Sequence, residues 1–310
     1  MGSMSAPPPP SGGPGRKPEW LKVRVPGGER YRAVRETLRE GGLHTVCEEA
    51  RCPNAAECWE SGTATFLLLG ETCTRGCGFC AVHRGDPGGA LDPGEPSQVA
   101  TAARRMGLSY AVLTSVTRDD LPDGGASVFA AAVARLKALV PPPLVEVLVP
   151  DYSNGPLAAV LTAGPDVLAH NVEVVERLTP DLRHGRFAYR RSLAVLQEAR
   201  TLSRAVLTKS SLLLGLGETR DEVLRTMEDL RTAGVEILVL GQYLQPTRSH
   251  AAVRAFVPPE AFEALAEEGR RMGFGYVAAA PLARTSYRAA EAYVQRLRKG
   301  GEPIPAGAGA

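Results

Sequence analysis

Six cysteines lie within one short stretch of the 310-residue chain and form two groups of three. In chain order they are Cys47, Cys52, Cys58, Cys73, Cys77 and Cys80. The first group has the spacing CxxxxCxxxxxC and the second has CxxxCxxC. Thiolate is the ligand that iron–sulfur clusters use, and a 4Fe-4S cluster held by three cysteines leaves one iron open to bind something else. The two groups therefore indicate two iron–sulfur sites with reactive iron.

The alternative interpretation is a structural zinc site at one of the groups. Such a site takes four ligands and no cysteine remains, so a histidine would have to complete it. His83 lies three residues after Cys80, and His44 lies three residues before Cys47. A disulfide framework is disfavoured because the long remainder of the chain has no cysteine. His184 and His250 are isolated, and we expect surface or packing roles for them.

Composition excludes several other classes of protein. Hydrophobic residues make up 44% of the chain and charged residues 23%, and no apolar run reaches the about 18 residues that a spanning helix needs. Lys and Arg number 36 against 34 Asp and Glu, which gives no overall field for binding nucleic acid. Residues 1–16 lack the apolar core of a signal peptide, so we expect a disordered tail and a cytoplasmic protein.

Apolar β-rich runs alternate with helical patterns along most of the chain, which positions the candidate residues. Strands are expected at 65–70, 110–116, 144–150, 167–171, 207–215 and 237–243, with a last short run at 276–281. Helices are expected at 126–139, at 258–272, after Ser97 and after Thr219. This alternation predicts an α/β fold, a partial parallel (β/α)6 barrel. Polar, glycine-bearing loops follow the strands, so the ligand site is expected at the carboxyl ends of the strands.

Several polar side chains sit at these strand ends or within the strands. Asn171 and Glu173 could offer an amide and a carboxylate to one small ligand, or could satisfy a buried strand end. Lys209 interrupts an apolar strand, which indicates either a buried ion pair or a ligand carboxylate. The run that contains Arg118, Asp119, Asp120 and Asp123 favours a positioning role over acid–base catalysis. The GLGET sequence at 215–219 is interpreted as a glycine turn that caps a helix.

The chain resembles a known family from residue 17 to about residue 295. CxxxCxxC is the radical S-adenosylmethionine (SAM) signature, and the preceding cysteine group with CPNAAECW is similar to that of lipoyl synthases. Other matching stretches are GETCTRGCGFCAV, TSVTRDDLPDGGA, VLVPDY, HNVE, KSSLLLGLGET, VLGQYLQPTR and RTSYRA. The family usually has Ser where Thr285 stands and Pro where Gly78 stands. We expect the change at Gly78 to affect loop stiffness and not ligation.

The resemblance implies two 4Fe-4S clusters. Cys73, Cys77 and Cys80 would hold the cluster whose open iron binds the amino and carboxylate groups of SAM. Cys47, Cys52 and Cys58 would hold an auxiliary cluster, with Ser286 as its fourth ligand. By the same analogy, Asn171 and Glu173 are expected at the ribose or methionine end of SAM, and Phe79 at its adenine. The N-terminal and C-terminal extensions would then fold over the barrel mouth.

The implied reaction is the radical insertion of two sulfur atoms at C6 and C8 of a protein-bound octanoyl-lysine. SAM would be cleaved to 5'-deoxyadenosine and methionine, and the auxiliary cluster would donate the sulfur. The implied substrates are octanoylated carrier domains of 2-oxoacid dehydrogenases or the glycine-cleavage H protein. A flavodoxin or ferredoxin would supply electrons, and an iron–sulfur carrier would rebuild the cluster. No nucleic acid and no membrane are expected.

The same resemblance suggests a division of the chain. Residues 1–16 would form the tail, 17–60 an extension with the auxiliary cluster, 61–281 the partial barrel, and 282–310 an extension with the RTSY segment. Two rival functions stay open at this point. One is a radical SAM enzyme whose auxiliary cluster only binds substrate or relays electrons. The other is a zinc-stabilised α/β barrel that acts as a binding module, for example for RNA.

Overall fold

One curved, mostly parallel sheet organises the computed structural model of the chain, which describes residues 16–22, 27–49, 52, 54–60, 62–285 and 291–298. The strands of this sheet are β1 (His44–Thr45), β2 (Thr63–Leu68), β5 (Tyr110–Ser115), β6 (Leu144–Leu148), β7 (Val167–Ala169), β8 (Leu207–Leu214), β9 (Ile237–Gln242) and β10 (Tyr276–Ala279). They are hydrogen-bonded in that order. Only β1 runs antiparallel, and in the described residues no pairing joins β10 back to β1. The sheet is thus a partial barrel, as the alternation of elements predicts.

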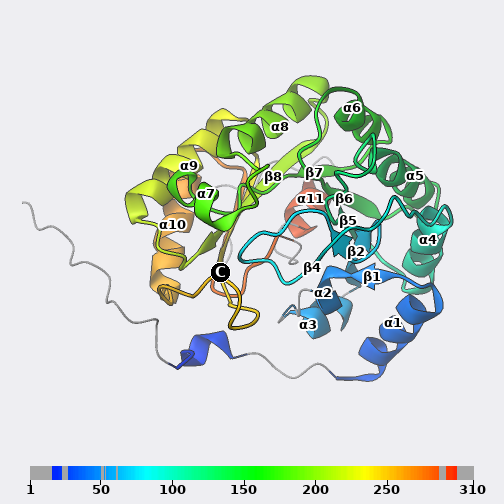
Figure 1. Cartoon of the computed structure of the whole chain (residues 1–310), viewed down its shortest axis with the longest axis horizontal. Coiled ribbons are helices and arrows are strands. Elements are labelled where there is room, and N and C mark those ends of the chain that lie inside the picture. Colours follow the sequence, from blue (N-terminus) through cyan, green and yellow to red (C-terminus); the bar gives the residue numbers. More distant parts are fainter. Residues whose placement is uncertain are drawn as a thin grey trace, which may run out of the picture.

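Helices surround this sheet (Figure 1). The outer ring contains α4 (Glu95–Arg105), α5 (Ala126–Lys137), α6 (Asn154–Thr162), α8 (Tyr189–Leu202), α9 (Arg220–Thr232) and α10 (Pro259–Arg271). The N-terminal part supplies α1 (Glu29–Glu40), α2 (Val46–Glu49) and α3 (Ala55–Glu60), and two short helices are α7 (Thr179–Leu182) and α11 (Glu291–Arg298). Short 3-10 turns occur at Glu19–Leu21 and Glu176–Leu178. The strands are buried because helices cover the outside of the sheet while side chains fill its inside.

Two of the predicted helix starts have different outcomes. Thr219 caps α9 in a reciprocal capping box with Glu222, so that prediction is confirmed. Helix α4 begins at Glu95, two residues before the predicted opener Ser97. Pro96 fits the first turn because its missing N–H would have no helical partner there. The Glu95 carboxylate accepts hydrogen bonds from the backbone of Leu69, at 3.0 and 3.1 Å, and so fixes the loop after β2.

The C-terminal extension divides between the two ends of the barrel. Residues 281–285 follow β10 at the carboxyl ends of the strands, whereas α11 contacts residues that precede or begin the strands. Glu291 accepts hydrogen bonds from Thr63 and Ser109, and Tyr293 donates to Glu236. The expectation that this whole extension covers the mouth is therefore wrong for α11. Its apolar side chains, Tyr293 and Val294, instead complete the core at the amino ends of the strands.

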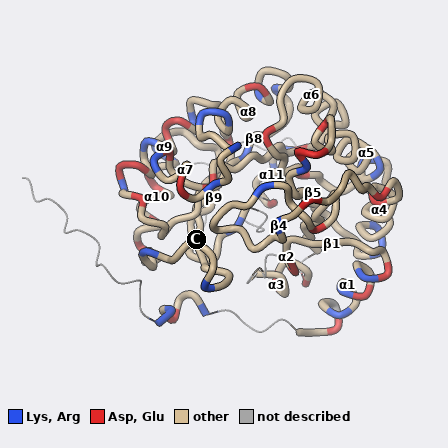
Figure 2. Tube along the Cα trace, viewed as in Figure 1, with Lys and Arg blue, Asp and Glu red and all other residues tan. Residues whose placement is uncertain are grey.

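Charge is evenly mixed over the molecule. Lys and Arg alternate with Asp and Glu along the outer helices, as Figure 2 shows for α1, α8 and α9. This pattern agrees with the formal net charge of +2. Among the described residues, no helix has both the length and the apolar character needed to cross a bilayer.

Candidate functional site

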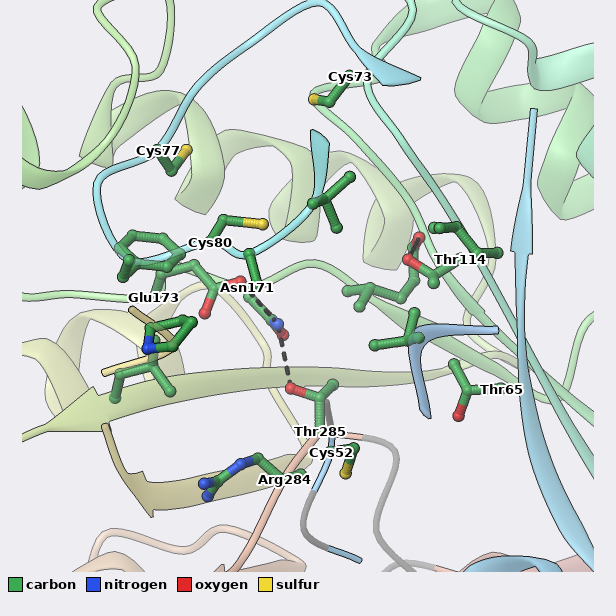
Figure 3. Close-up of a pocket in the computed structure, with 18 of the residues that line it drawn as sticks. Cys52, Thr65, Cys73, Cys77, Cys80, Thr114, Asn171, Glu173, Arg284 and Thr285 are labelled. Carbon is green, nitrogen blue, oxygen red and sulfur yellow. Dashed lines mark hydrogen bonds between the residues drawn. The ribbon is translucent and has the colours of Figure 1, made fainter. Parts of the chain in front are cut away.

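All six cysteines line one cavity at the carboxyl ends of the strands. Its volume is about 650 Å³, within the range of cavities that hold small-molecule ligands. Cys73, Cys77 and Cys80 lie on one side, and Cys52 lies on the opposite side (Figure 3). The loops of a parallel sheet gather at this end, which is why two segments separate in sequence share the cavity. The structure thus brings together both cysteine groups that the sequence singles out.

Backbone pairing and hydrogen bonds from backbone N–H groups hold the CxxxCxxC loop in place. It leaves β3 (Thr72–Cys73), which pairs with β4 (His83–Arg84) in a small second sheet. The Sγ of Cys73 accepts hydrogen bonds from the backbone N–H groups of Arg75 and Thr117, both at 3.4 Å. Gly78 donates its N–H to the carbonyl of Leu182 at 2.8 Å, a bond that the usual Pro could not make. The sulfurs are thereby presented from a fixed loop.

Arg75, inside this loop, binds two carboxylates on neighbouring strand-end loops. Its Nε and Nη2 donate to Asp119, and its Nη1 donates to Asp151, each at 2.8 Å. The ring of Phe187 lies between the guanidinium groups of Arg75 and Arg183, at 4.3 and 4.1 Å from its centroid. These contacts tie the cysteine loop to the loops after β5 and β6. Asp119 therefore has the positioning role that the sequence favours.

The N-terminal cysteine group is built by α2, α3 and the residues between them. Cys47 lies in α2, Cys58 lies in α3, and the N–H of Cys52 donates to the carbonyl of Cys47 at 3.1 Å. Asn54 donates from Nδ2 to the carbonyl of Leu282 at 2.7 Å, which joins this group to the segment after β10. The N-terminal extension thus reaches the mouth of the barrel, as expected.

Burial raises the pKa of thiols in each cysteine group, including those of Cys52 and Cys77. It raises the pKa of Cys47 to about 12, with Cys52 and Cys58 adding to the effect. It also raises the pKa of Cys80 to about 12, where Cys77 and Cys73 contribute. A metal that binds these sulfurs must displace protons, so its binding energy has to exceed this cost.

Neither cysteine group is compact enough for a single ion. In the described residues, the only set of three side chains with ligand atoms within 4.8 Å of one another is His44, Glu49 and Glu71, which contains no thiol. Tetrahedral zinc with Zn–S bonds of 2.3 Å requires sulfurs about 3.8 Å apart. The described residues therefore contain no preformed three-thiol zinc site.

Asn171 and Glu173 lie between the two cysteine groups (Figure 3). Glu173 adopts a left-handed backbone conformation with φ of 66°, unusual outside glycine, and Asn171 Nδ2 donates to its carboxylate at 3.0 Å. Burial raises the pKa of Glu173 against the opposing effects of Arg183 and Asn171. Asn171 is 7% exposed, and its Oδ1 has no hydrogen-bond partner. A buried acceptor without a partner beside a carboxylate suits a ligand that carries hydroxyl or amino groups.

Other candidates have mixed outcomes. Phe79 lines the cavity, and its contact with adenine stays a prediction. Lys209 forms a buried ion pair with Glu146, with Nζ 2.9 Å from both carboxylate oxygens, so the ion-pair alternative holds. Ser286 lies outside the described residues.

Two side chains at the site escape prediction from sequence. His250, expected to be a surface or packing residue, has its Nε2 3.0 Å from the carbonyl of Cys80. A carbonyl can only accept, so Nε2 carries the proton. Arg284, next to Thr285, lines the cavity near Cys52. In the sequence, the only indication that His250 and Arg284 belong to the site is that they lie in the QYLQPTRSH and RTSY segments.

Comparisons with known proteins agree with this geometry. The profile of the Radical SAM superfamily matches residues 67–230, and that of the N-terminal domain of lipoyl synthase of the Radical SAM family matches residues 10–52. A lipoyl synthase of Sorangium cellulosum is 53% identical over 95% of this chain and 84% of its own length. One of Thermus thermophilus is 52% identical over 91% of this chain and 88% of its own. The mitochondrial lipoyl synthase of Picea sitchensis is 50% identical over 91% and 75%.

Solved structures are similar in fold at low identity. Methylornithine synthase superposes with a TM-score of 0.53 and 14% identity, over 88% of this chain and 94% of that one. Streptococcus suis SuiB bound to S-adenosylmethionine gives a TM-score of 0.55 and 8% identity, over 73% and 53%. These matches concern the architecture of the partial barrel alone.

Proposed function

The chain belongs to the lipoyl synthase family of the Radical SAM superfamily, and from this membership we propose how its residues carry out the family's reaction. Its activity is that of a radical SAM sulfurtransferase, which inserts two sulfur atoms into an octanoyl group bound to a protein carrier domain. We propose that Cys73, Cys77 and Cys80 hold the cluster that binds SAM. We further propose that an auxiliary cluster is held by Cys47, Cys52, Cys58 and Ser286.

One observation supports this assignment above the others: both groups of thiols line a single cavity. The two target carbons of an octanoyl chain carry only unactivated C–H bonds, which no side-chain base can deprotonate. The bound clusters and SAM supply the electron, the hydrogen-abstracting radical and the sulfur that amino acids cannot provide. The contribution of the chain is to hold these groups around one substrate and to keep water out.

Individual side chains have distinct tasks in this proposal. Glu173 and Asn171 would orient the polar ends of SAM, since they present a carboxylate and an unpartnered amide oxygen beside the CxxxCxxC loop. Phe79 would pack against the adenine. Arg75 would keep the loop in place through Asp119 and Asp151. Each of these groups binds or orients, and none has to transfer a proton.

The proposed partners of the reaction are those that the resemblance to the family implies. The protein substrate is an octanoylated carrier domain, for which we propose those of 2-oxoacid dehydrogenases or the glycine-cleavage H protein. A flavodoxin or ferredoxin would supply electrons, and an iron–sulfur carrier would restore the auxiliary cluster. We propose a cytoplasmic location, since six thiols that serve as iron ligands need a reducing compartment. We propose that the chain divides into a tail (1–16), an N-terminal extension (17–60), the partial barrel (61–281) and a C-terminal extension (282–310).

The test is an anaerobic reaction on an octanoyl-lysyl carrier peptide, followed by mass spectrometry of the peptide and iron counting. The wild type should hold about eight irons per chain and add two sulfur atoms. The triple variant C47A/C52A/C58A should hold about half the iron and still cleave SAM, but should add no sulfur. The triple variant C73A/C77A/C80A should lose both reactions. Sulfur insertion by C47A/C52A/C58A would overturn the assignment of the auxiliary cluster.

The rival radical enzyme, whose auxiliary cluster only binds substrate or relays electrons, predicts a different sulfide balance. In the proposed reaction, sulfide should leave the auxiliary site in proportion to product. A constant sulfide content over turnover would favour the rival. The zinc-stabilised binding module loses support because the described residues contain no preformed three-thiol site, and because Lys and Arg are interspersed with Asp and Glu along the chain (Figure 2).

A further inference from the structure

A chain of hydrogen bonds crosses the cavity from one cysteine group toward the other (Figure 3). Asn171 Nδ2 donates to the carboxylate of Glu173 and to Oγ1 of Thr285, both at 3.0 Å. The hydroxyl of Thr285 in turn donates to Oγ of Ser211 on β8, at 2.8 Å. Residues 282–285 are thereby joined to the strand-end residues that face the CxxxCxxC loop.

Two hydrogen bonds fix the orientation of the Thr285 hydroxyl. It accepts one hydrogen bond from Asn171 and donates one to Ser211, so its single proton and one lone pair are both used. Both amide hydrogens of Asn171 are also engaged in hydrogen bonds, one to Glu173 and one to Thr285. The only free polar atom of that side chain is Oδ1, which is buried without a partner. Thr285 thus helps to fix which way the Asn171 amide turns its acceptor.

The same segment reaches the N-terminal cysteine group at its other end. The carbonyl of Leu282 accepts the hydrogen bond from Asn54, which lies between Cys52 and Cys58 in sequence. Arg284 lies near Cys52 and opposes the increase that burial causes in the pKa of that thiol. Residues 282–285 therefore contact both halves of the cavity, and no other described segment after β10 does so.

We propose that Thr285 is a positioning residue that couples the two cluster sites. Filling the auxiliary site holds residues 282–285 in place, and the Thr285 hydroxyl transmits this to the Asn171 amide, which is then ready to bind SAM. By thermodynamic linkage, bound SAM must strengthen the docking of the same segment. This inference rests on the proposed function, because it takes Asn171 to be a SAM contact.

The coupling can be measured as a ratio of SAM affinities. The dissociation constant of SAM is determined by anaerobic equilibrium dialysis on the enzyme with both clusters and on C47A/C52A/C58A, which retains only the CxxxCxxC cluster. We expect the enzyme with both clusters to bind SAM at least about fivefold more tightly than C47A/C52A/C58A does. A factor of about five is the lower end of the typical range of coupling between two sites. The same ratio is then measured in proteins that carry one further substitution, at residue 285 or at a control position.

Three second substitutions make the result decisive. Thr285→Val removes the hydroxyl at similar volume, and its ratio should fall to about one. Thr285→Ser retains the hydroxyl and should restore the wild-type ratio. Thr208→Val is the matched control: it removes another buried hydroxyl on β8, which donates to the carbonyl of Gly234, away from the cavity. This control should keep the wild-type ratio.

Each contrary outcome has one meaning. A wild-type ratio of one, or an unchanged ratio in Thr285→Val, overturns the coupling while leaving the proposed function intact. Loss of the ratio in Thr208→Val as well would assign the effect to general destabilisation and also overturn it. Failure of the wild-type protein to bind SAM at all would instead reject the proposed function. As a readout that needs neither cluster nor SAM, hydrogen exchange of residues 282–285 in cluster-free protein should be faster in Thr285→Val than in Thr285→Ser.

Discussion

The guanidinium of Arg75 holds the carboxylate of Asp119 in a two-point contact, with Nε and Nη2 both at 2.8 Å from its oxygens. Arg75 lies between the first two cysteines of the CxxxCxxC loop, and Asp119 lies in the loop after β5. A planar guanidinium can make this contact, whereas a lysine amine cannot. The pair thus fixes the loop in angle as well as in position.

Loss of Arg75 should destabilise the fold strongly. Its other partner, Asp151, has a side chain only 3% exposed and would remain as a buried charge beside His170, whose pKa burial lowers. Arg75→Ala should lower the free energy of unfolding of cluster-free protein by about 3–5 kcal/mol, measured by urea denaturation. The control is Arg105→Ala, whose partner Glu40 is exposed; it should cost less than about 1 kcal/mol. Equal losses in the two variants would contradict this prediction.

The same contact predicts a dependence on pH. The Arg75 guanidinium holds the pKa of Asp119 at about 2, below its usual value of 3.8. A carboxyl group with a lowered pKa stabilises the fold above its usual value, and this contribution is lost as the pH falls toward 2. The stability difference between wild type and Asp119→Asn should therefore be largest above about pH 5 and shrink between about pH 4 and pH 2. A difference that stays constant over this range would refute the role of ionised Asp119.

Gly241 should be needed for the segment after β10. A Cβ built at Gly241 would overlap with the carbonyl oxygen of Ala283, which is backbone and cannot turn away. Gly241→Ala should cost about 1–3 kcal/mol of stability and lower the iron retained by the N-terminal cysteine group. Gly155→Ala is the control, because a Cβ there meets nothing within 4 Å. Iron counts after gel filtration would check this, and equal retention in the two variants would argue against it.

Lys209 should stabilise the barrel and have no direct role in binding SAM. Its partner Glu146 is fully buried and also accepts a hydrogen bond from Tyr110 at 2.7 Å. Lys209→Met should cost about 3–5 kcal/mol because it leaves that charge unpaired. The double variant K209M/E146Q should recover much of this loss, as a thermal denaturation cycle would show. If the single variant were as stable as wild type but bound SAM weakly, the ligand alternative would return.

Much of the barrel follows from local signals in the sequence. Apolar runs such as 110–115 and 237–242 form strands because helices cover one face and the barrel interior covers the other, so most side chains along them are apolar and buried. Thr219 caps α9 because its hydroxyl and the Glu222 carboxylate satisfy each other's backbone N–H groups over three residues.

Contacts between distant segments were harder to predict. The bond from Asn171 to Thr285 joins residues 114 positions apart, and His250 meets a carbonyl 170 positions away. No periodicity or spacing encodes such pairs, since they depend on how the loops after different strands fold over one another. The location of α11 was missed for the same reason. Its apolar side chains indicate burial, but not at which end of the barrel.

The division of the C-terminal extension has a consequence for how the enzyme is made. Translation proceeds from the amino end, so residues 281–285 and 291–298 leave the ribosome after all six cysteines. Until these residues dock, the nascent barrel lacks α11, which completes the core at the amino ends of the strands. It also lacks residues 282–285, which line the cavity and contact Asn54 and Asn171. Metal delivery thus has a window during biosynthesis in which all six thiols are present but the wall is still open.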